Sequence, residues 1–175
     1  DLPVALGWSL TPAALKTAAM FCLLFGAGGQ FLAGVMSLAN KNTLGGTLLT
    51  TFSFNWVFNW YVLDEASQGR GVDSSVMLSV DVTFIIIFIV LTYAFGFFSK
   101  LLVAFLVIID VIYALRIVRE VAHTQAVATP LAIATVGLTA ISLYIAIALV
   151  LVSASGKPIL PMGGPAWGSA TPPAH

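Results

Sequence analysis

Residues 40–61, NKNTLGGTLLTTFSFNWVFNWY, combine a polar corner, a Gly-Gly pair and a long apolar and aromatic run. Within this stretch a polar residue recurs at every fourth position: Thr43, Thr47, Thr51, Asn55 and Asn59. Residues four apart lie almost above one another on an α-helix. Residues 43–63 are therefore predicted to form a helix with one uncharged polar stripe and a bulky apolar remainder.

The composition indicates an integral membrane protein. The chain has 175 residues, of which 59% are hydrophobic and 8% charged, and its mean hydropathy is +1.04. A typical soluble domain carries about 25% charged residues, and a soluble fold of this length has too little interior to hide so much apolar surface. Lys and Arg balance Asp and Glu at seven each, so the chain lacks the basic surplus of a nucleic-acid-binding protein.

Side chains that hold metals or carry out covalent chemistry are sparse. Cys22 is the only cysteine, and the two histidines, His123 and His175, are far apart in the sequence. We find neither metal-ligand spacing nor a nucleophile with a neighbouring base. We therefore expect no metal, no cofactor and no enzymatic activity.

Five apolar segments are each long enough to cross a bilayer, which takes about 20 residues. They are predicted at residues 13–39, 43–63, 75–98, 101–121 and 130–153. Their apolar character is continuous and does not alternate at every second residue, which indicates helices and not barrel strands. We predict an all-α integral membrane protein with about five transmembrane helices in a compact bundle.

The chain is predicted to have three parts: an N-terminal segment at 1–12, a helical membrane domain at 13–154 and a tail at 155–175. The tail is rich in Pro and Gly, so we expect it to be irregular and mobile. Thr11 is the predicted N-cap of the first helix, with Pro12 in its first turn. That helix carries a ladder of mostly small residues, which favours close helix packing in lipid: Ala18, Cys22, Gly26, Gln30 and Gly34.

The polar stripe of residues 43–59 has two interpretations. Its hydroxyl and amide groups can hydrogen-bond neighbouring helices, which is worth about 0.6–2 kcal/mol for each bond. Alternatively, they line a path on which they replace the water around a small carboxylate. The physics of the residues alone favours the first interpretation.

Two carboxylates, Asp81 and Asp110, fall inside predicted helices. An ionised carboxylate at a helix centre costs about 2.5–3.5 kcal/mol on insertion scales. Both are candidate proton sites that couple carboxylate movement to protons, and Asp110 is the better one because it lies nearer the middle of its helix. The alternatives are that Asp81 lies near the membrane surface and that Asp110 pairs with a neighbouring helix or subunit. Arg116 and Glu120, four residues apart, are predicted to form a surface ion pair.

Several short motifs occur in one order along the chain. They are GAGGQFLAG at 26–34, NTLG at 42–45, TTF at 50–52 with Trp56 after it, and GKPILPMG at 156–163. Together they resemble the GPR1/FUN34/YaaH family of acetate and succinate transporters. The resemblance covers most of the chain and implies the six-helix acetate transporter fold. Residues 2–7 resemble the family's N-terminal signature, and the helix that follows it in the family is expected to be absent here.

The resemblance implies a function and a set of site residues. It implies a channel or transporter for small monocarboxylates such as acetate, or for succinate, in a multi-pass protein of the cell membrane that assembles as a homo-hexamer. Phe52 and Ile109 match an aromatic and an aliphatic residue that narrow the family's pore, and Ser142 matches a small residue that influences substrate size. The first half of the polar stripe is assigned to the substrate path: Asn42, Thr43, Thr47 and Thr51.

A second hypothesis is a non-transporting structural subunit that keeps the family fold inside a larger membrane complex. The expected loss of one helix favours it, as do the intramembrane acids and the long Pro/Gly tail. Of these acids, Asp81 occupies a position at which the family often has Trp. In this hypothesis the polar residues of 55–61 contact neighbouring helices or a partner chain.

Overall fold

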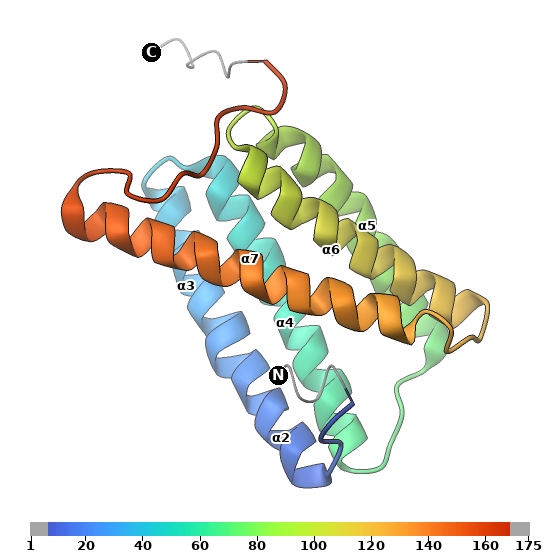
Figure 1. Ribbon diagram of the computed structural model, residues 1–175. Coiled ribbons are helices and arrows are strands. Elements are labelled where there is room, and N and C mark those ends of the chain that lie inside the picture. The colour runs from blue at the N-terminus through green and yellow to red at the C-terminus, as the bar shows by residue number, and fades with distance from the viewer. Residues whose placement is uncertain (1–6, 169–175) are drawn as a thin grey trace. The chain divides into compact units, whose positions relative to one another are not determined.

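The computed structural model describes residues 7–168, and within this range every regular element is a helix, so the predicted all-α class is confirmed. The elements are α2 (Pro12–Phe21), the π-helical η1 (Cys22–Gly29), α3 (Gln30–Ala39), α4 (Thr43–Ser67), α5 (Ser74–Phe95), α6 (Lys100–Val121) and α7 (Ala128–Ser155) (Figure 1). The chain divides into two compact units, Asp1–Met77 and Leu78–His175, with the boundary in the first turn of α5. Most of the N-terminal signature at 2–7, and the last prolines of the tail, lie outside the described residues.

Four helical stretches within residues 7–168 are long and apolar enough to cross a membrane. They are Pro12–Ala39, Ser74–Phe95, Lys100–Val121 and Ala128–Ser155. The protein is therefore a multi-pass membrane protein. The fifth predicted span, α4, has 25 residues and thus the length of a span, but its threonines, asparagines and acidic end make it less apolar than the others.

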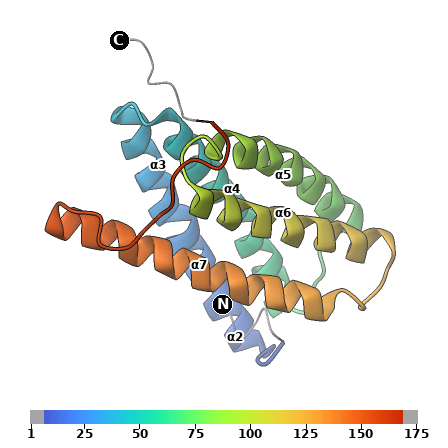
Figure 2. The ribbon, with the colours of Figure 1, turned by 45° about the horizontal axis from the view of Figure 1, so that its top comes forward.

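In the first unit, the continuous helical run Pro12–Ala39 lies antiparallel to α4 (Figures 1 and 2). The predicted start is confirmed, since Thr11 Oγ1 accepts a hydrogen bond from the backbone N of Ala14 at 3.2 Å and Pro12 is the first helical residue. The predicted small-residue ladder is the inner face of this run. Its members are buried or half-buried: Ala18, Cys22, Gly26, Gln30 and Gly34.

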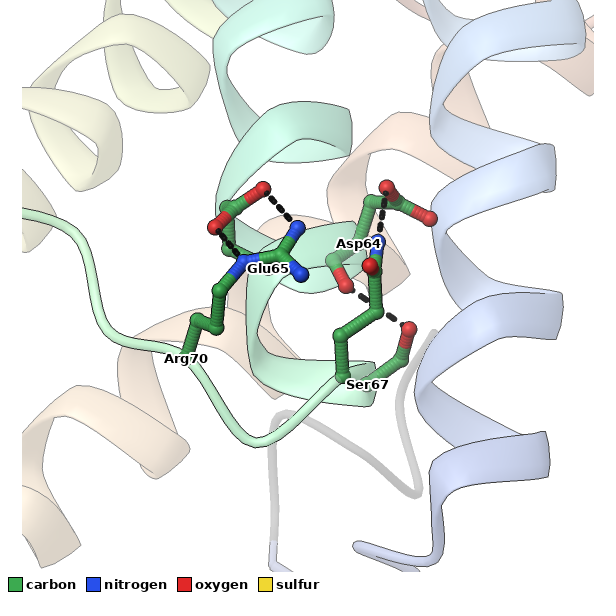
Figure 3. A network of polar contacts seen from close by, with 5 residues as sticks. Asp64, Glu65, Ser67 and Arg70 are labelled. Carbon is green, nitrogen blue, oxygen red and sulfur yellow. Dashed lines mark hydrogen bonds and ion pairs between the residues drawn. The ribbon is translucent and has the colours of Figure 1, made fainter.

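The C-terminal end of α4 lies four residues beyond the predicted one, at Ser67. Figure 3 shows the side chains that hold this last turn. Ser67 Oγ donates to the carbonyl of Asp64 at 2.7 Å, and Arg70 donates from Nε and Nη2 to the two oxygens of Glu65 at 2.6 and 2.7 Å. These hydrogen bonds lower the pKa of the Glu65 carboxyl. The predicted loop over 64–74 is therefore too long, because charged residues continue the helix when they are bonded locally.

Asp73 caps the start of α5. Its Oδ1 accepts hydrogen bonds from the backbone N of Ser75 at 2.9 Å, from the backbone N of Val76 at 3.2 Å and from the Ser75 hydroxyl. The bond from the Ser75 hydroxyl is the largest cause, ahead of the two backbone bonds, that lowers the pKa of Asp73. A carboxylate beside the first free amides of a helix is also favoured by the helix dipole.

Because of this cap, the stability of the folded protein is expected to depend on pH, and the direction of the change follows from the lowered pKa of Asp73. A carboxyl whose pKa is lower in the folded state stabilises that state above its unfolded pKa, and the stabilisation is lost as the pH falls through the folded pKa. We expect the thermal midpoint of the wild-type protein to exceed that of Asp73→Asn by a constant amount above about pH 5 and by less at lower pH. Thermal unfolding in detergent across this pH range measures the difference. An unchanged difference at acid pH would show that the charge of Asp73 has no part in the cap.

In the second unit, α5 and α6 form an antiparallel hairpin, and α7 packs against α6 (Figures 1 and 2). α5 was predicted to reach residue 98 but ends at Phe95. The backbone turns after it, and the N of Ser99 donates to the carbonyl of Phe95 at 3.1 Å. Ser99 then caps α6, since its Oγ accepts from the backbone N of Leu102 at 3.4 Å.

Residues 156–168, which we call the strap, leave α7 and run over the α5–α6 connection (Figures 1 and 2). Gly156 ends α7 in a left-handed conformation, with φ of 67°. The backbone N of Lys100 donates to the carbonyl of Gly164 at 2.9 Å, and the N of Ala166 donates to the carbonyl of Gly96 at 2.7 Å. The predicted irregular backbone is confirmed, and these bonds fasten it to the hairpin.

Trp167 anchors the far end of the strap. Its indole Nε1 donates a hydrogen bond to the backbone carbonyl of Tyr93 at 3.1 Å. The indole also stacks on the Tyr93 ring, with the ring centroids 5.8 Å apart. A Cβ on Gly96 would lie 1.9 Å from the indole ring, so only glycine leaves room for this contact. An aromatic ring with a satisfied N–H is an effective anchor because it combines apolar area with one directed bond.

Candidate functional site

The predicted path residues on α4 begin with its N-cap, Asn42. The Oδ1 of Asn42 accepts a hydrogen bond from the backbone N of Gly45 at 3.0 Å. A Cβ on Gly45 would lie 2.6 Å from the Asn42 amide, so the glycine is required for the cap to close. The NTLG motif thus has a structural task of its own, which is to start α4 at a fixed residue.

The polar stripe becomes more buried along α4. Thr43 and Thr47 are exposed, Thr51 is half-buried and Asn55 is buried, whereas Asn59 at the end of the stripe is again half-buried. The exposed threonines lie one helical turn apart on the same face of the helix. The stripe therefore presents uncharged hydroxyl groups at its start and buries its polar groups further along.

Glycine contacts between backbones fix how α4 is rotated against α3. A Cβ on Gly34 would lie 2.7 Å from Thr50 Cγ2 and 3.0 Å from the Thr50 backbone N. A Cβ on Gly46 would lie 2.5 Å from the Leu38 side chain and 3.0 Å from the carbonyl O of Gly34. This is the close approach that small residues permit between membrane helices. It sets the direction in which the stripe points.

A second contact joins α4 to the π-helical segment η1. A Cβ on Gly26 would lie 2.6 Å from the Trp56 ring, and Ser53 Oγ donates to the carbonyl of Ala27 at 3.0 Å in a buried position. Wide π turns in membrane helices often mark functional sites. Two buried polar atoms here have no hydrogen-bond partner among the described residues, namely Gln30 Oε1 and Trp56 Nε1.

The two predicted narrowing residues and the predicted size-determining residue lie on three different helices. Phe52 is buried on α4 in the first unit, Ile109 is buried on α6 in the second, and Ser142 is half-buried on α7. The Oγ of Ser142 donates to the carbonyl of Leu138 at 2.6 Å, within its own helix. Their grouping with the stripe into one substrate path stays a prediction.

Asp110, the preferred proton site, lies in the α5–α6 hairpin. Its Oδ2 is 2.7 Å from Thr92 Oγ1 on α5, and the same hydroxyl is 2.8 Å from the carbonyl O of Phe88. Its Oδ1 is buried and has no hydrogen-bond partner among residues 7–168. The expected pairing of Asp110 with a neighbouring helix is therefore found as the bond to Thr92, while its role in proton transfer stays a prediction.

Asp81 forms an ion pair with Arg116 of α6. Arg116 Nε lies 3.0 Å from Asp81 Oδ2, and its Nη2 lies 2.8 Å from Asp81 Oδ1. The Asp81 side chain is 0% exposed and that of Arg116 is 17% exposed. Nε donates a hydrogen bond to Oδ2, whereas the approach of Nη2 to Oδ1 is a charge contact without hydrogen-bond geometry. Arg116, for which an ion pair with Glu120 is predicted, thus pairs with Asp81 of α5, and Glu120 lies 3.6 Å from Arg119.

Aromatic rings fill the hairpin between these two acids. Tyr113 stacks on Phe84 with centroids 5.9 Å apart, and it packs at a tilt against Phe88 with centroids 5.4 Å apart. The guanidinium carbon of Arg116 lies 5.4 Å from the centre of the Tyr113 ring, within cation–π range. The ion pair is thus held on one side by an ordered aromatic cluster.

Sequence reasoning missed these cross-helix partners, although a signal for them exists. On α6, Asp110, Tyr113 and Arg116 are three residues apart and share a face, and on α5 the same holds for a stripe of polar and aromatic residues: Asp81, Phe84, Phe88 and Thr92. Two such stripes on consecutive helices predict an antiparallel pairing in which Asp81 meets Arg116. Among residues 7–168, no three His, Cys, Asp or Glu side chains gather closely enough to hold a metal ion.

No protein-family model matches the sequence, and no curated protein matches it. The fold is nevertheless similar to a solved structure, that of the bacterial acetate channel SatP. The TM-score is 0.80 at 18% sequence identity, and the likeness covers 93% of this chain and 89% of the channel chain. At this identity the comparison shows the fold alone, and the protein has the fold of an acetate channel.

Proposed function

We propose that this protein conducts small monocarboxylates such as acetate across the cell membrane, as a homo-oligomer. The observation that carries the proposal is the similarity of the fold to that of an acetate channel, with a TM-score of 0.80 over 93% of this chain. The uncharged stripe on α4 supports it. A lining of hydroxyl and amide groups binds an anion weakly enough for it to leave again, as conduction requires.

In this proposal the path follows the first half of α4 and narrows at apolar residues. Asn42, Thr43, Thr47 and Thr51 line it, the narrowing consists of Phe52 and Ile109, and Ser142 is the small residue that influences substrate size. An apolar narrowing excludes strongly hydrated ions because it is costly to keep wet. Monocarboxylates with a small apolar tail pass such a point more easily than dicarboxylates do.

Phe52→Ala tests the narrowing. We expect purified protein in liposomes to take up labelled acetate faster than empty liposomes, and we expect Phe52→Ala to raise the ratio of succinate to acetate uptake several-fold. The physical reason is that the wider, wetter opening admits a more hydrated ion. Initial uptake rates should be measured well above the pKa of acetic acid, where unassisted diffusion of the neutral acid is slow.

Phe54→Ala is the matched control. Phe54 lies on the same helix but is 62% exposed, so its removal should leave the succinate-to-acetate ratio unchanged. If both variants shift the ratio equally, the effect comes from general loosening of α4, and the assignment of Phe52 to the narrowing fails.

We propose Asp110 as the proton site. The single hydroxyl hydrogen of Thr92 faces two oxygens, the Phe88 carbonyl at 2.8 Å and Asp110 Oδ2 at 2.7 Å. One hydrogen satisfies only one of them. A proton on Asp110 supplies the second bond, which supports a carboxyl that carries a proton in this site. Asp81 is the weaker candidate because it is engaged with Arg116.

Asp110→Asn tests the coupling. If acetate moves with a proton through Asp110, an imposed pH gradient should accelerate uptake by the wild-type protein, and Asp110→Asn should lose most of this acceleration while keeping uptake without a gradient. Asn preserves the size of the side chain and a bond to Thr92, so folding should be retained. Equal acceleration in the two proteins would exclude Asp110 as the proton site.

The rival is a non-transporting structural subunit, and the Asp81–Arg116 pair favours it. This pair uses two charged side chains to fix α5 against α6, which is a structural task. The mass of the native assembly separates the two functions. A complex of this chain alone supports conduction, whereas fixed stoichiometry with other chains supports the structural role.

A further inference from the structure

The Arg116 guanidinium is a built carboxylate receptor. Two of its nitrogens, Nε and Nη2, face the two oxygens of one carboxylate at 3.0 and 2.8 Å. Its carbon lies 5.4 Å from the Tyr113 ring centre, and that ring is stacked on Phe84 and packed at a tilt against Phe88. The receptor is therefore positioned by residues other than the carboxylate that it holds.

The occupant of this receptor is chemically close to acetate. The side chain of Asp81 is a methylene group with a carboxylate, which is an acetate ion attached to the backbone. It is 0% exposed, whereas the Arg116 side chain is 17% exposed. The neighbouring charges Arg119 and Glu120 lie 3.6 Å from each other.

We propose that Arg116, with Tyr113 and Phe84, forms a binding site for small monocarboxylates and that Asp81 is its tethered occupant. An external carboxylate competes with Asp81 for the same two guanidinium nitrogens, Nε and Nη2. The ligand class is that of the proposed function, on which this inference rests in part. The test is an equilibrium measurement on the protein alone, so its failure is distinguishable from a failure to transport.

Chemical rescue of Asp81→Ala tests the site. The substitution removes the carboxylate group but keeps Cβ, so it leaves space for the carboxylate end of acetate beside an arginine without its partner. The full-length variant is purified in parallel in sodium chloride and in sodium acetate at equal ionic strength, and its thermal midpoint is measured. We expect acetate at about ten times its dissociation constant to raise the midpoint by about 3–6 °C over chloride. The wild-type protein should shift less, because Asp81 already fills the site.

Two controls separate binding from a general salt effect. Asp81→Ala combined with Arg116→Met should show no difference between acetate and chloride, and pivalate, which is too bulky for the space, should not replace acetate. A variant that folds only in acetate also supports the site. The proposal is overturned if acetate stabilises Asp81→Ala no more than chloride does, if the double variant is rescued equally, or if Asp81→Ala folds in neither salt.

Discussion

Arg116→Met, with Asp81 left in place, is expected to lose about 3–5 kcal/mol of unfolding free energy. The loss arises because the Asp81 carboxylate, 0% exposed, would be left inside the hairpin without its cation. Methionine keeps much of the length and apolar volume of the arginine stem, so the effect reports the charge and not a cavity. Unfolding in mixed micelles with increasing denaturing detergent, followed by circular dichroism, measures it.

The matched control replaces both partners. In Asp81→Leu combined with Arg116→Met the buried charges are gone, and an apolar pair of this kind is often as stable as the ion pair that it replaces. We expect the double variant to be more stable than Arg116→Met alone. If the unfolding free energy of Arg116→Met lies within about 1 kcal/mol of that of the wild type, the Asp81–Arg116 pair contributes no more than a surface ion pair.

Gly34→Leu is expected to separate α3 from α4 and to prevent stable folding of the first unit. The new Cβ would lie 2.7 Å from Thr50 Cγ2, 3.0 Å from the Thr50 backbone N and 3.3 Å from the carbonyl O of Gly46. Two of these atoms belong to the backbone of α4, so no side-chain movement relieves the clash. Overpacking usually costs about 1–3 kcal/mol, and a backbone clash places this variant at or beyond the upper end.

Gly29→Ala is the control for this variant. Gly29 belongs to the same helical run, and a Cβ added there meets no atom within 4 Å among the described residues. We expect its thermal midpoint and its yield of monodisperse protein in detergent to stay close to those of the wild type. Equal losses in the two variants would mean that glycine is needed for its backbone freedom and not for close contact between helices.

The helical spans were predictable because lipid leaves the backbone few alternatives. The fourth predicted span, residues 101–121, differs from α6 by one residue at its start. Helix ends were predicted less well wherever a local hydrogen bond decides them. Charged residues suggested that α4 stops at residue 63, but the bonds of Ser67 and Arg70 to Asp64 and Glu65 extend it.

The candidate site was predictable only in part. The four-residue ladder of the first helix correctly predicted a packed face, because spacing on one helix is written in the sequence. The pairing of Arg116 with Asp81 was not predicted, because the i, i+4 rule within one helix favours Glu120, whereas the signal for Asp81 appears only when the stripes of α5 and α6 are aligned with each other. The joining of Phe52, Ile109 and Ser142 into one path rests on resemblance, and helical spacing alone does not predict it.

The most direct test of the account is the initial rate of labelled acetate uptake into liposomes that contain the purified wild-type protein. It should be measured at a pH well above the pKa of acetic acid and compared with empty liposomes and with liposomes that contain an unrelated membrane protein. The account predicts saturable uptake above both controls, with competition by unlabelled propionate and little competition by chloride. Uptake no faster than in empty liposomes, from protein shown to be folded, would contradict the proposed function.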